Sequence, residues 1–243
     1  MNRSLFANAS HLPRGLFAFA CLALIFAGLF HAKFPSTVYA QQLVNDVSMG
    51  SNSIVTKSAS AGAKPASADE TFIQLAETVG QAAAAKRLID YKLKSDPAGH
   101  ERYYAVVDFS KPSTEKRLFV FDTVEKKVES YLVAHGRGSG ENVAERFSNV
   151  SGSNSSSLGI YKTLNEYIGN HGRSLRLAGL EPTNSNALSR AVVMHTAGYV
   201  SENFIRQTGR LGRSEGCFAV EKSVGDMLIN KLKDGAYIIA AKN

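Results

Sequence analysis

One cysteine and one histidine in the C-terminal part of the chain have the residue types of a nucleophile and its base. Cys217 follows a Gly-Arg-Ser-Glu-Gly segment, and His195 ends an apolar stretch upstream. A thiolate attacks carbonyl carbon, and an imidazole beside it takes the proton. Such a neighbour can lower a thiol pKa from about 8.5 into the range of about 3.5–7.5. We therefore expect Cys217 to be the nucleophile and His195 its base.

The cysteine count strengthens this expectation. The only other cysteine, Cys21, lies in the apolar N-terminal run and would leave with a signal peptide. An exported protein with one thiol cannot close a disulfide within itself, so the thiol pairs with another chain, is buried and inert, or reacts. The glycines, serine and arginine around Cys217 argue against inert burial.

The first forty residues predict export. Arg3 and Arg14 precede an uncharged, largely apolar run over residues 15–30, and a Val-Tyr-Ala sequence ends at Ala40. This order is typical of a signal peptide, residues 1–40, with cleavage between Ala40 and Gln41. An uncleaved anchor is the alternative, although the run is shorter than the roughly 20 residues of a spanning helix. Both interpretations predict a periplasmic or otherwise extracytoplasmic domain, and cleavage would leave no membrane span.

Charge gives little indication of a partner. The formal charge of +7 rests on 28 basic and 21 acidic residues, and residues 1–40 hold three of the basic ones and no acid. The mature chain therefore has 25 basic against 21 acidic residues, or +4. A modest excess suits an anionic envelope polymer or an ordinary solvated surface equally well. No motif or basic run interleaved with aromatic residues indicates nucleic acid, and the oligomeric state is left open.

The chain pattern predicts one domain that is mainly β. Residues 41–66 are rich in small and polar residues and indicate a flexible low-complexity arm. Ser67 and Glu70 then have capping-box spacing ahead of an amphipathic helix over residues 67–94. Runs rich in Val, Ile, Phe and Tyr predict strands at 102–109, 117–122, 128–135, 159–162, 174–177, 190–195 and 236–241, with helices at 200–207 and 223–233. We expect a β-rich sandwich or barrel with a few helices, forming a single catalytic domain over residues 67–243.

These elements suggest how the thiol and the imidazole meet. His195 would stand at the end of a strand, and a loop with glycines at 209, 212 and 216 would return the chain to it. The amides of Gly216 and Cys217 are then natural donors to an oxyanion. The remaining histidines show no metal-ligand spacing, so we expect no metal and no cofactor.

The segment over residues 195–219, with its Gly-Arg-Ser-x-Gly-Cys core, resembles the L,D-transpeptidases of the bacterial cell wall, or YkuD-like domains. It is closest to the subgroup of murein L,D-transpeptidase catalytic domain proteins. Further blocks occur in the order that this subgroup shows, at residues 108–118, 133–140 (Val-Ala-His-Gly-Arg-Gly-Ser-Gly), 147–150, 156–159 and 171–177 (His-Gly-Arg-Ser-Leu-Arg-Leu). The resemblance extends from about residue 103 to the C-terminus.

The resemblance implies a β-rich fold and a reaction on peptidoglycan stem peptides. The Cys217 thiolate would attack the carbonyl of the third residue of a tetrapeptide, release D-alanine and transfer the acyl group to an amine or to water. By the same resemblance, the backbone carbonyl of Thr196 orients the His195 ring, and Gly216 and Cys217 hold the oxyanion. The expected catalytic residues are Cys217, His195, Thr196 and Gly216, and the expected substrate-binding residues are Arg213, Ser214, His171, Ser157 and Gly159.

Three positions depart from the subgroup's pattern. Glu215 stands where a tryptophan is usual, Phe218 replaces a proline, and Thr196 replaces the glycine after the histidine. A carboxylate beside the nucleophile raises the thiol pKa unless it is paired with a cation such as Arg213 or His195. One alternative is therefore a weak or inactive cell-wall-binding protein on the same fold. Another is a cysteine protease or amidase with a different substrate.

Overall fold

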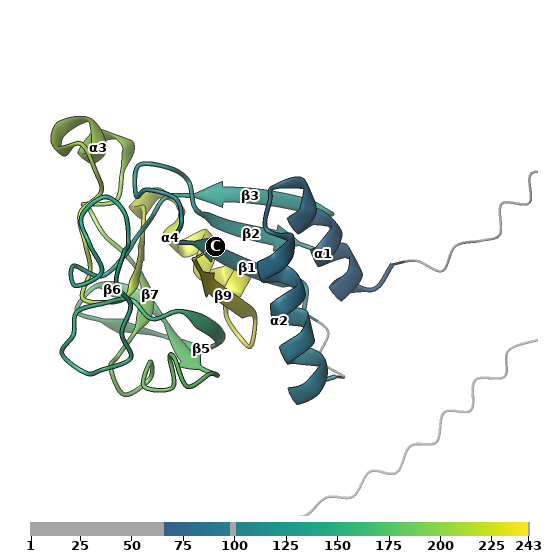
Figure 1. The fold of residues 1–243 in the computed structure, drawn as a ribbon. Coiled ribbons are helices and arrows are strands. Elements are labelled where there is room, and N and C mark those ends of the chain that lie inside the picture. Colours follow the sequence, from purple (N-terminus) through teal and green to yellow (C-terminus); the bar gives the residue numbers. More distant parts are fainter. Residues whose placement is uncertain (1–65, 98–100, 243) are drawn as a thin grey trace, which may run out of the picture. The chain divides into compact units, whose positions relative to one another are not determined.

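The computed structural model describes residues 66–97 and 101–242 (Figure 1). The predicted signal peptide, and the predicted arm up to residue 65, lie outside the described residues. The described part contains four helices: α1 (Ala68–Thr78), α2 (Ala82–Ser95), α3 (Glu202–Thr208) and α4 (Lys222–Leu232). Its nine strands are β1 (Tyr103–Asp108), β2 (Leu118–Asp122), β3 (Lys127–Tyr131), β4 (Val133–Ala134), β5 (Gly159–Gly169), β6 (Gly172–Gly179), β7 (Val193–Thr196), β8 (Phe218–Val220) and β9 (Tyr237–Ala241). The expected mainly β fold with a few helices is confirmed.

The helix expected over residues 67–94 is instead two helices. Ser67 and Glu70 form the predicted capping box at the start of α1. Gly80 then adopts a φ of 73°, the amide of Gln81 donates to the carbonyl of Ala76, and the Gly80 amide donates to the carbonyl of Glu77. This is a Schellman ending, in which a left-handed glycine satisfies the last carbonyls of a helix. The glycine that weakens the helical pattern therefore ends α1, and α2 starts two residues later.

All nine strands form one sheet, in the order β3-β2-β1-β9-β5-β6-β7-β8-β4. Successive side chains of a strand point to opposite faces. On β1, Tyr104 and Val106 accordingly pack with residues of α1 and α2, whereas Ala105 and Val107 belong to the core that includes the buried side of α4. Figure 1 shows α1 and α2 beside the strands β1, β2 and β9. Burial on both faces explains why β1 and β9 are almost continuously apolar.

The strands that carry the expected site residues lie together at one end of this order. β7 pairs antiparallel with β6 and parallel with β8. β5 and β6 form a hairpin that is longer than the sequence predicts, since β5 extends to Gly169 through a register shift between Thr163 and Glu166. A two-residue turn, Asn170-His171, joins Gly169 to Gly172. The hairpin therefore brings its tip to the same part of the sheet as β7 and β8.

Across residues 66–97 and 101–242, none of the helices combines the length and the apolar character that crossing a bilayer requires.

Candidate active site

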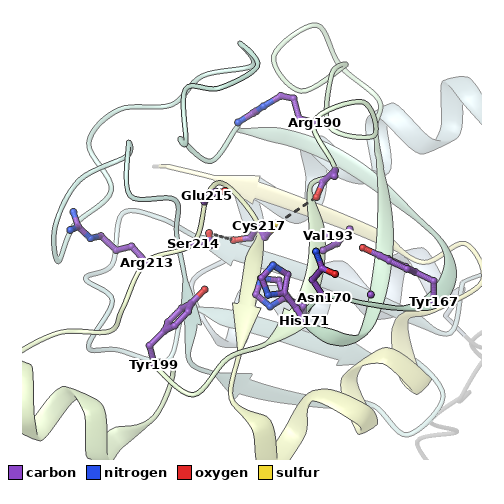
Figure 2. A pocket seen from close by; sticks show the side chains of 13 residues that line it. Tyr167, Asn170, His171, Arg190, Val193, Tyr199, Arg213, Ser214, Glu215 and Cys217 are labelled. Carbon is purple, nitrogen blue, oxygen red and sulfur yellow. Dashed lines mark hydrogen bonds between the residues drawn. The ribbon is translucent and has the colours of Figure 1, made fainter. Parts of the chain in front are cut away.

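Cys217 and His195 line the same cavity, which has a volume of about 600 Å³ (Figure 2). This size lies within the usual range of small-molecule sites. The walls come from the β5–β6 hairpin, from β7 and the segments directly before and after it, and from the loop before β8. They consist of Tyr167, Gly169, Asn170, His171, Arg190, Ala191, Val193, His195, Tyr199, Arg213, Ser214, Glu215 and Cys217.

The neutral ring of His195 is held in one tautomer by the next residue. Its Nδ1 lies 3.0 Å from the backbone carbonyl oxygen of Thr196. Because a carbonyl only accepts, Nδ1 carries the hydrogen, and the lone pair is on Nε2. Burial lowers the pKa of His195 below its usual 6.5, and the neighbouring His171 acts in the same direction. The ring is therefore neutral at pH 7, with Nε2 free to accept a proton.

His171 comes to the cavity from the tip of the β5–β6 hairpin. Its ring stacks on that of His195, with centroids 4.2 Å apart and an interplanar angle of 20°. Ser174 of β6 pairs with His195 of β7, so the hairpin register fixes this approach. Protonating both stacked rings would place two positive charges in contact, which favours a neutral His195.

Cys217 lies immediately before β8. The parallel pairing of Phe218 with Met194 sets the cysteine level with Val193, the first residue of β7, two residues before His195. The thiol is partly exposed, and its Sγ lies 3.6 Å from the carbonyl oxygen of Ala191, to which it donates (Figure 2). Cys217 is therefore not fully buried in the core, and it lies beside β7, the strand that carries His195.

The expectation of a thiol pKa lowered by the imidazole is wrong for this resting geometry. Burial raises the pKa of Cys217 above its usual value, and Glu215 adds to the increase. A hydrogen bond from the Val193 backbone and the charge of Arg190 oppose it without cancelling it. A neutral His195 supplies no positive charge to stabilise a thiolate. The resting pair is therefore a thiol and a neutral imidazole.

Two hydrogen bonds of the Ser214 hydroxyl hold the loop before Cys217 in place. The Ser214 hydroxyl accepts a hydrogen bond from the Gly216 amide at 3.1 Å and donates to the carbonyl of Cys217 at 2.7 Å. Gly216 has a φ of 120°, and a Cβ there would lie 2.8 Å from the carbonyl oxygen of Ser155. Only glycine fits this conformation and this approach.

This bonding corrects the expected oxyanion hole. The Gly216 amide is already committed to Ser214 and does not point to the cavity as a free donor. Among the described residues, no hydrogen bond of a turn or loop engages the backbone amide of Cys217. The Cys217 amide is therefore the one of the two expected donors that is available to an oxyanion.

Both charged residues before the nucleophile have partners from the loop over residues 137–141. Glu215 pairs with Arg137, with 3.1 Å between Oε1 and Nη2, and not with Arg213 or His195. Arg213 pairs with Glu141 at 2.6 Å and donates to the carbonyl of Gly140 at 3.1 Å. Arg213 and Ser214 line the cavity as expected, but Arg213 has an internal carboxylate in place of a substrate one.

Two expected substrate-binding residues do not reach the cavity. The Ser157 hydroxyl is buried and lies 2.8 Å from that of Tyr161. Gly159 starts β5 with a φ of 125°, and a Cβ there would lie 2.6 Å from a carboxylate oxygen of Glu181. Neither residue is among those that line the cavity, so the structure does not bring them into contact with a ligand there.

Other residues line the cavity that the sequence did not single out. Arg190 donates to the carbonyls of Ser148 at 2.8 Å and Ser155 at 2.6 Å, and so fixes the serine-rich loop behind Gly216. Burial raises the pKa of Tyr199 to about 12, so its hydroxyl stays protonated at neutral pH. Glycines on both sides of Asn170-His171 were a sequence signal for the hairpin turn, whereas Arg190 and Tyr199 had none.

Metal-ligating side chains do not gather in the described part of the chain in any group of three or more histidine, cysteine or acidic residues.

The comparison with protein-family models identifies one family. The family model of the L,D-transpeptidase catalytic domain matches residues 75–240. A search of curated proteins finds no match. Among solved structures, an L,D-transpeptidase from Mycobacterium smegmatis is 12% identical with a TM-score of 0.36, and the match covers 58% of each chain. One from Stackebrandtia nassauensis is 14% identical with a TM-score of 0.37, covering 71% of this chain and 76% of that one. One from Mycobacterium tuberculosis H37Rv is 15% identical with a TM-score of 0.33, covering 58% of each.

The present chain thus spans 58% of the length of the first of these structures. The family model covers more than half of this chain, including every strand from β1 to β8 and both members of the cysteine–histidine pair. The chain belongs to the L,D-transpeptidase catalytic domain family.

Proposed function

We propose that this protein is an exported peptidoglycan L,D-transpeptidase in which Cys217 is the nucleophile and His195 the proton carrier. Nε2 of His195 takes the thiol proton as Sγ attacks the carbonyl carbon of the third residue of a stem tetrapeptide. The tetrahedral intermediate collapses with cleavage of the bond to D-alanine, and the imidazolium returns the proton to the departing amine. An amine of a second stem then attacks the thioester, and water in its place gives the carboxypeptidase outcome.

One observation carries this proposal: a partly exposed thiol and a neutral imidazole with an unprotonated Nε2 line the same cavity. General acid–base catalysis requires a base that is unprotonated at the working pH. The lowered pKa of His195 provides this, and the raised pKa of Cys217 means that the proton moves as the attack occurs. The hydrogen bond from the thiol to Ala191 must break as the proton turns to the ring.

Charge that develops on the substrate oxygen needs a donor close to Sγ. The Cys217 amide is suited to this because the nucleophile and the donor belong to the same residue. Ser214 holds the Gly216 amide, and with it the loop conformation that presents Cys217. In this proposal Ser214 therefore positions the nucleophile, and a stem carboxylate approaching Arg213 competes with Glu141 for it.

The cellular setting of the proposal rests on residues 1–40. Their two arginines, apolar run and Val-Tyr-Ala ending are those of a signal peptide. Peptidoglycan lies outside the inner membrane, so a periplasmic or otherwise extracytoplasmic location gives the enzyme access to its substrate.

A catalytically weak cell-wall-binding protein is the second candidate, and the electrostatics of the thiol favour it. Burial and Glu215 both raise the pKa of Cys217. Paired Arg213 offers less to a substrate carboxylate than a free arginine would. The two candidates share the cavity and differ in turnover.

Purified muropeptides with tetrapeptide stems distinguish them. Incubation with the mature protein should release D-alanine and give new dimers linked between third residues, both of which disappear in Cys217→Ala. Binding of the muropeptides without any release of D-alanine would identify the wall-binding protein. Cleavage of a bond other than the one to D-alanine would indicate the protease or amidase alternative.

A further inference from the structure

We infer that Gly225 of α4 is a positioning residue for His195, acting through Thr196. The inference rests on the proposed function, since it assigns a role in preparing the base of that reaction. Gly225 lies outside the cavity and touches neither the thiol nor the imidazole, so its effect is transmitted by the carbonyl that holds the ring.

The contact between α4 and β7 is built around the missing side chain of Gly225. A Cβ added at this position would lie 2.0 Å from Cγ2 of Thr196. Its next neighbours would be Cβ of Thr196 at 3.4 Å and Cγ2 of Val220 at 3.8 Å, both within ordinary packing distances. The space at Gly225 is therefore occupied specifically by the methyl group of Thr196.

Backbone conformation does not explain a glycine here. Gly225 is buried within the α-helix Lys222–Leu232, and its φ is not in the left-handed region. Glycine in a helix interior costs about 0.5–1 kcal/mol relative to alanine. Alanine would therefore favour the helix in isolation, and the room needed by Thr196 is the feature that opposes it.

Thr196 links this contact to the base. Its carbonyl oxygen accepts the hydrogen of His195 Nδ1 at 3.0 Å and so selects the tautomer with a free Nε2. The clashing methyl group stands on a β-branched side chain with restricted χ1. Displacing this methyl group therefore shifts the Thr196 backbone, and this shift changes the direction of the Thr196 carbonyl.

The helix itself has little freedom to move away. Leu228, Ile229 and Leu232 are fully buried in the main core. On its outer side, Arg173 of β6 donates to the Asp226 carbonyl at 3.2 Å and to Asn230 Oδ1 at 2.5 Å. Thr196 is the last residue of a short strand. We therefore expect Thr196, and not α4, to move when a Cβ is added at Gly225.

Gly225→Ala tests the inference. Two double variants, Thr196→Ser/Gly225→Ala and Thr196→Gly/Gly225→Ala, test whether its effect passes through the Thr196 methyl group. Two quantities are measured: the rate of thiol acylation by a carbapenem, and the ¹⁵N signals of the His195 ring, assigned with His195→Gln. Gly225→Ala should lower the acylation rate by about 10-fold or more, since small misplacements of catalytic groups cost this much. It should also reduce the Nδ1–H form of His195. Each double variant lacks the Thr196 methyl group and should recover the rate and the ring signals of its own Thr196 single variant.

Gly198→Ala is the matched control. Gly198 lies three residues after His195, and a Cβ there meets only the end of Lys222, at 3.8 Å. It should leave rate and ring signals unchanged. The inference is overturned if Gly225→Ala keeps the wild-type ring signals, or if neither double variant recovers them. The ring signals are measurable even if the wild-type protein does not react with the carbapenem, so failure of the proposed function and failure of this inference remain distinct.

Discussion

The thiol of Cys217 donates its hydrogen to the backbone carbonyl of Ala191, with 3.6 Å between sulfur and oxygen. Ala191 has a φ of 53°, in the left-handed region that is unfavourable for a residue with a Cβ. Val192, which follows it, is buried in the core. The resting thiol is protonated because burial raises its pKa, its hydrogen points to a carbonyl of the cavity wall, and turnover requires His195 to take the proton.

The acylation rate should depend on pH through His195. Because burial lowers its pKa, the base form should persist below the usual imidazole pKa of about 6.5, and the rate should fall only at a pH lower than that, as the ring is protonated. His195→Ala should reduce the rate at pH 7 by about 10²–10⁴-fold. The residual rate should rise about tenfold per pH unit, since hydroxide then generates the thiolate. Stopped-flow acylation from pH 5 to 9 measures both, and a His195→Ala rate close to wild type would mean that another group takes the proton.

Ser214→Ala should loosen the nucleophile loop. The variant loses the acceptor of the Gly216 amide and the donor to the Cys217 carbonyl, both in a buried position. Leaving a buried group without its partner costs about 1–3 kcal/mol, so urea denaturation should show a loss of that size, with slower acylation. Ser189→Ala, which removes an exposed hydroxyl, is the control and should change neither quantity. Unchanged acylation in Ser214→Ala would contradict a positioning role.

Glu215→Gln should accelerate acylation by less than about 10-fold. The carboxylate raises the pKa of Cys217, but it is exposed and therefore screened by solvent and salt. Its ion pair with Arg137 lies on the surface, so the free energy of unfolding should change by no more than about 1 kcal/mol. Arg137→Gln leaves the charge of Glu215 unpaired and should act in the opposite direction. Slower acylation in Glu215→Gln would show that the carboxylate assists the reaction.

His135 should make stability dependent on pH. The ring is fully buried, its Nδ1 accepts from Arg117 at 2.7 Å, and burial together with that guanidinium lowers its pKa to about 4. Below about pH 6.5 the unfolded chain binds a proton that the folded protein does not, so stability is lost as pH falls from about 6.5 to about 4. From pH 7 to pH 5 the wild type should lose about 2 kcal/mol more than His135→Gln. Equal losses in urea titrations at the two pH values would exclude His135 as the group responsible.

The sequence pointed to Cys217 and His195, which line one cavity in the structure, because the signals of both residues are local. A histidine at the end of an apolar run and a cysteine after a glycine-rich turn are recognised without knowing the fold. The strand β8, which follows Cys217 and pairs with the histidine strand β7, had not been expected. The break at Gly80 and the extension of β5 were harder to predict. The end of the helix at Gly80 depends on the left-handed backbone conformation of this glycine. The polar part of β5 contains a register shift, which interrupts the alternation of side chains between the two faces.

The electrostatic state of the site could not be predicted from spacing. Glu141 pairs with Arg213 across 72 residues of sequence, and Arg137 comes from the same loop to pair with Glu215. The raised pKa of Cys217 follows from burial, and the Gly216 amide is engaged because the Ser214 hydroxyl lies within hydrogen-bond distance of it. These properties depend on tertiary packing, so the residue types alone suggested an activated thiolate and two oxyanion donors.

Intact-mass spectrometry of the mature protein after incubation with a carbapenem tests the central claim most directly. A β-lactam carbonyl acylates a reactive thiol, and ring opening retains all atoms of the drug. We predict a mass increase of one carbapenem molecule that is absent in Cys217→Ala. Folded wild-type protein that shows no adduct, or an adduct that persists in Cys217→Ala, would contradict the assignment of Cys217 as the nucleophile.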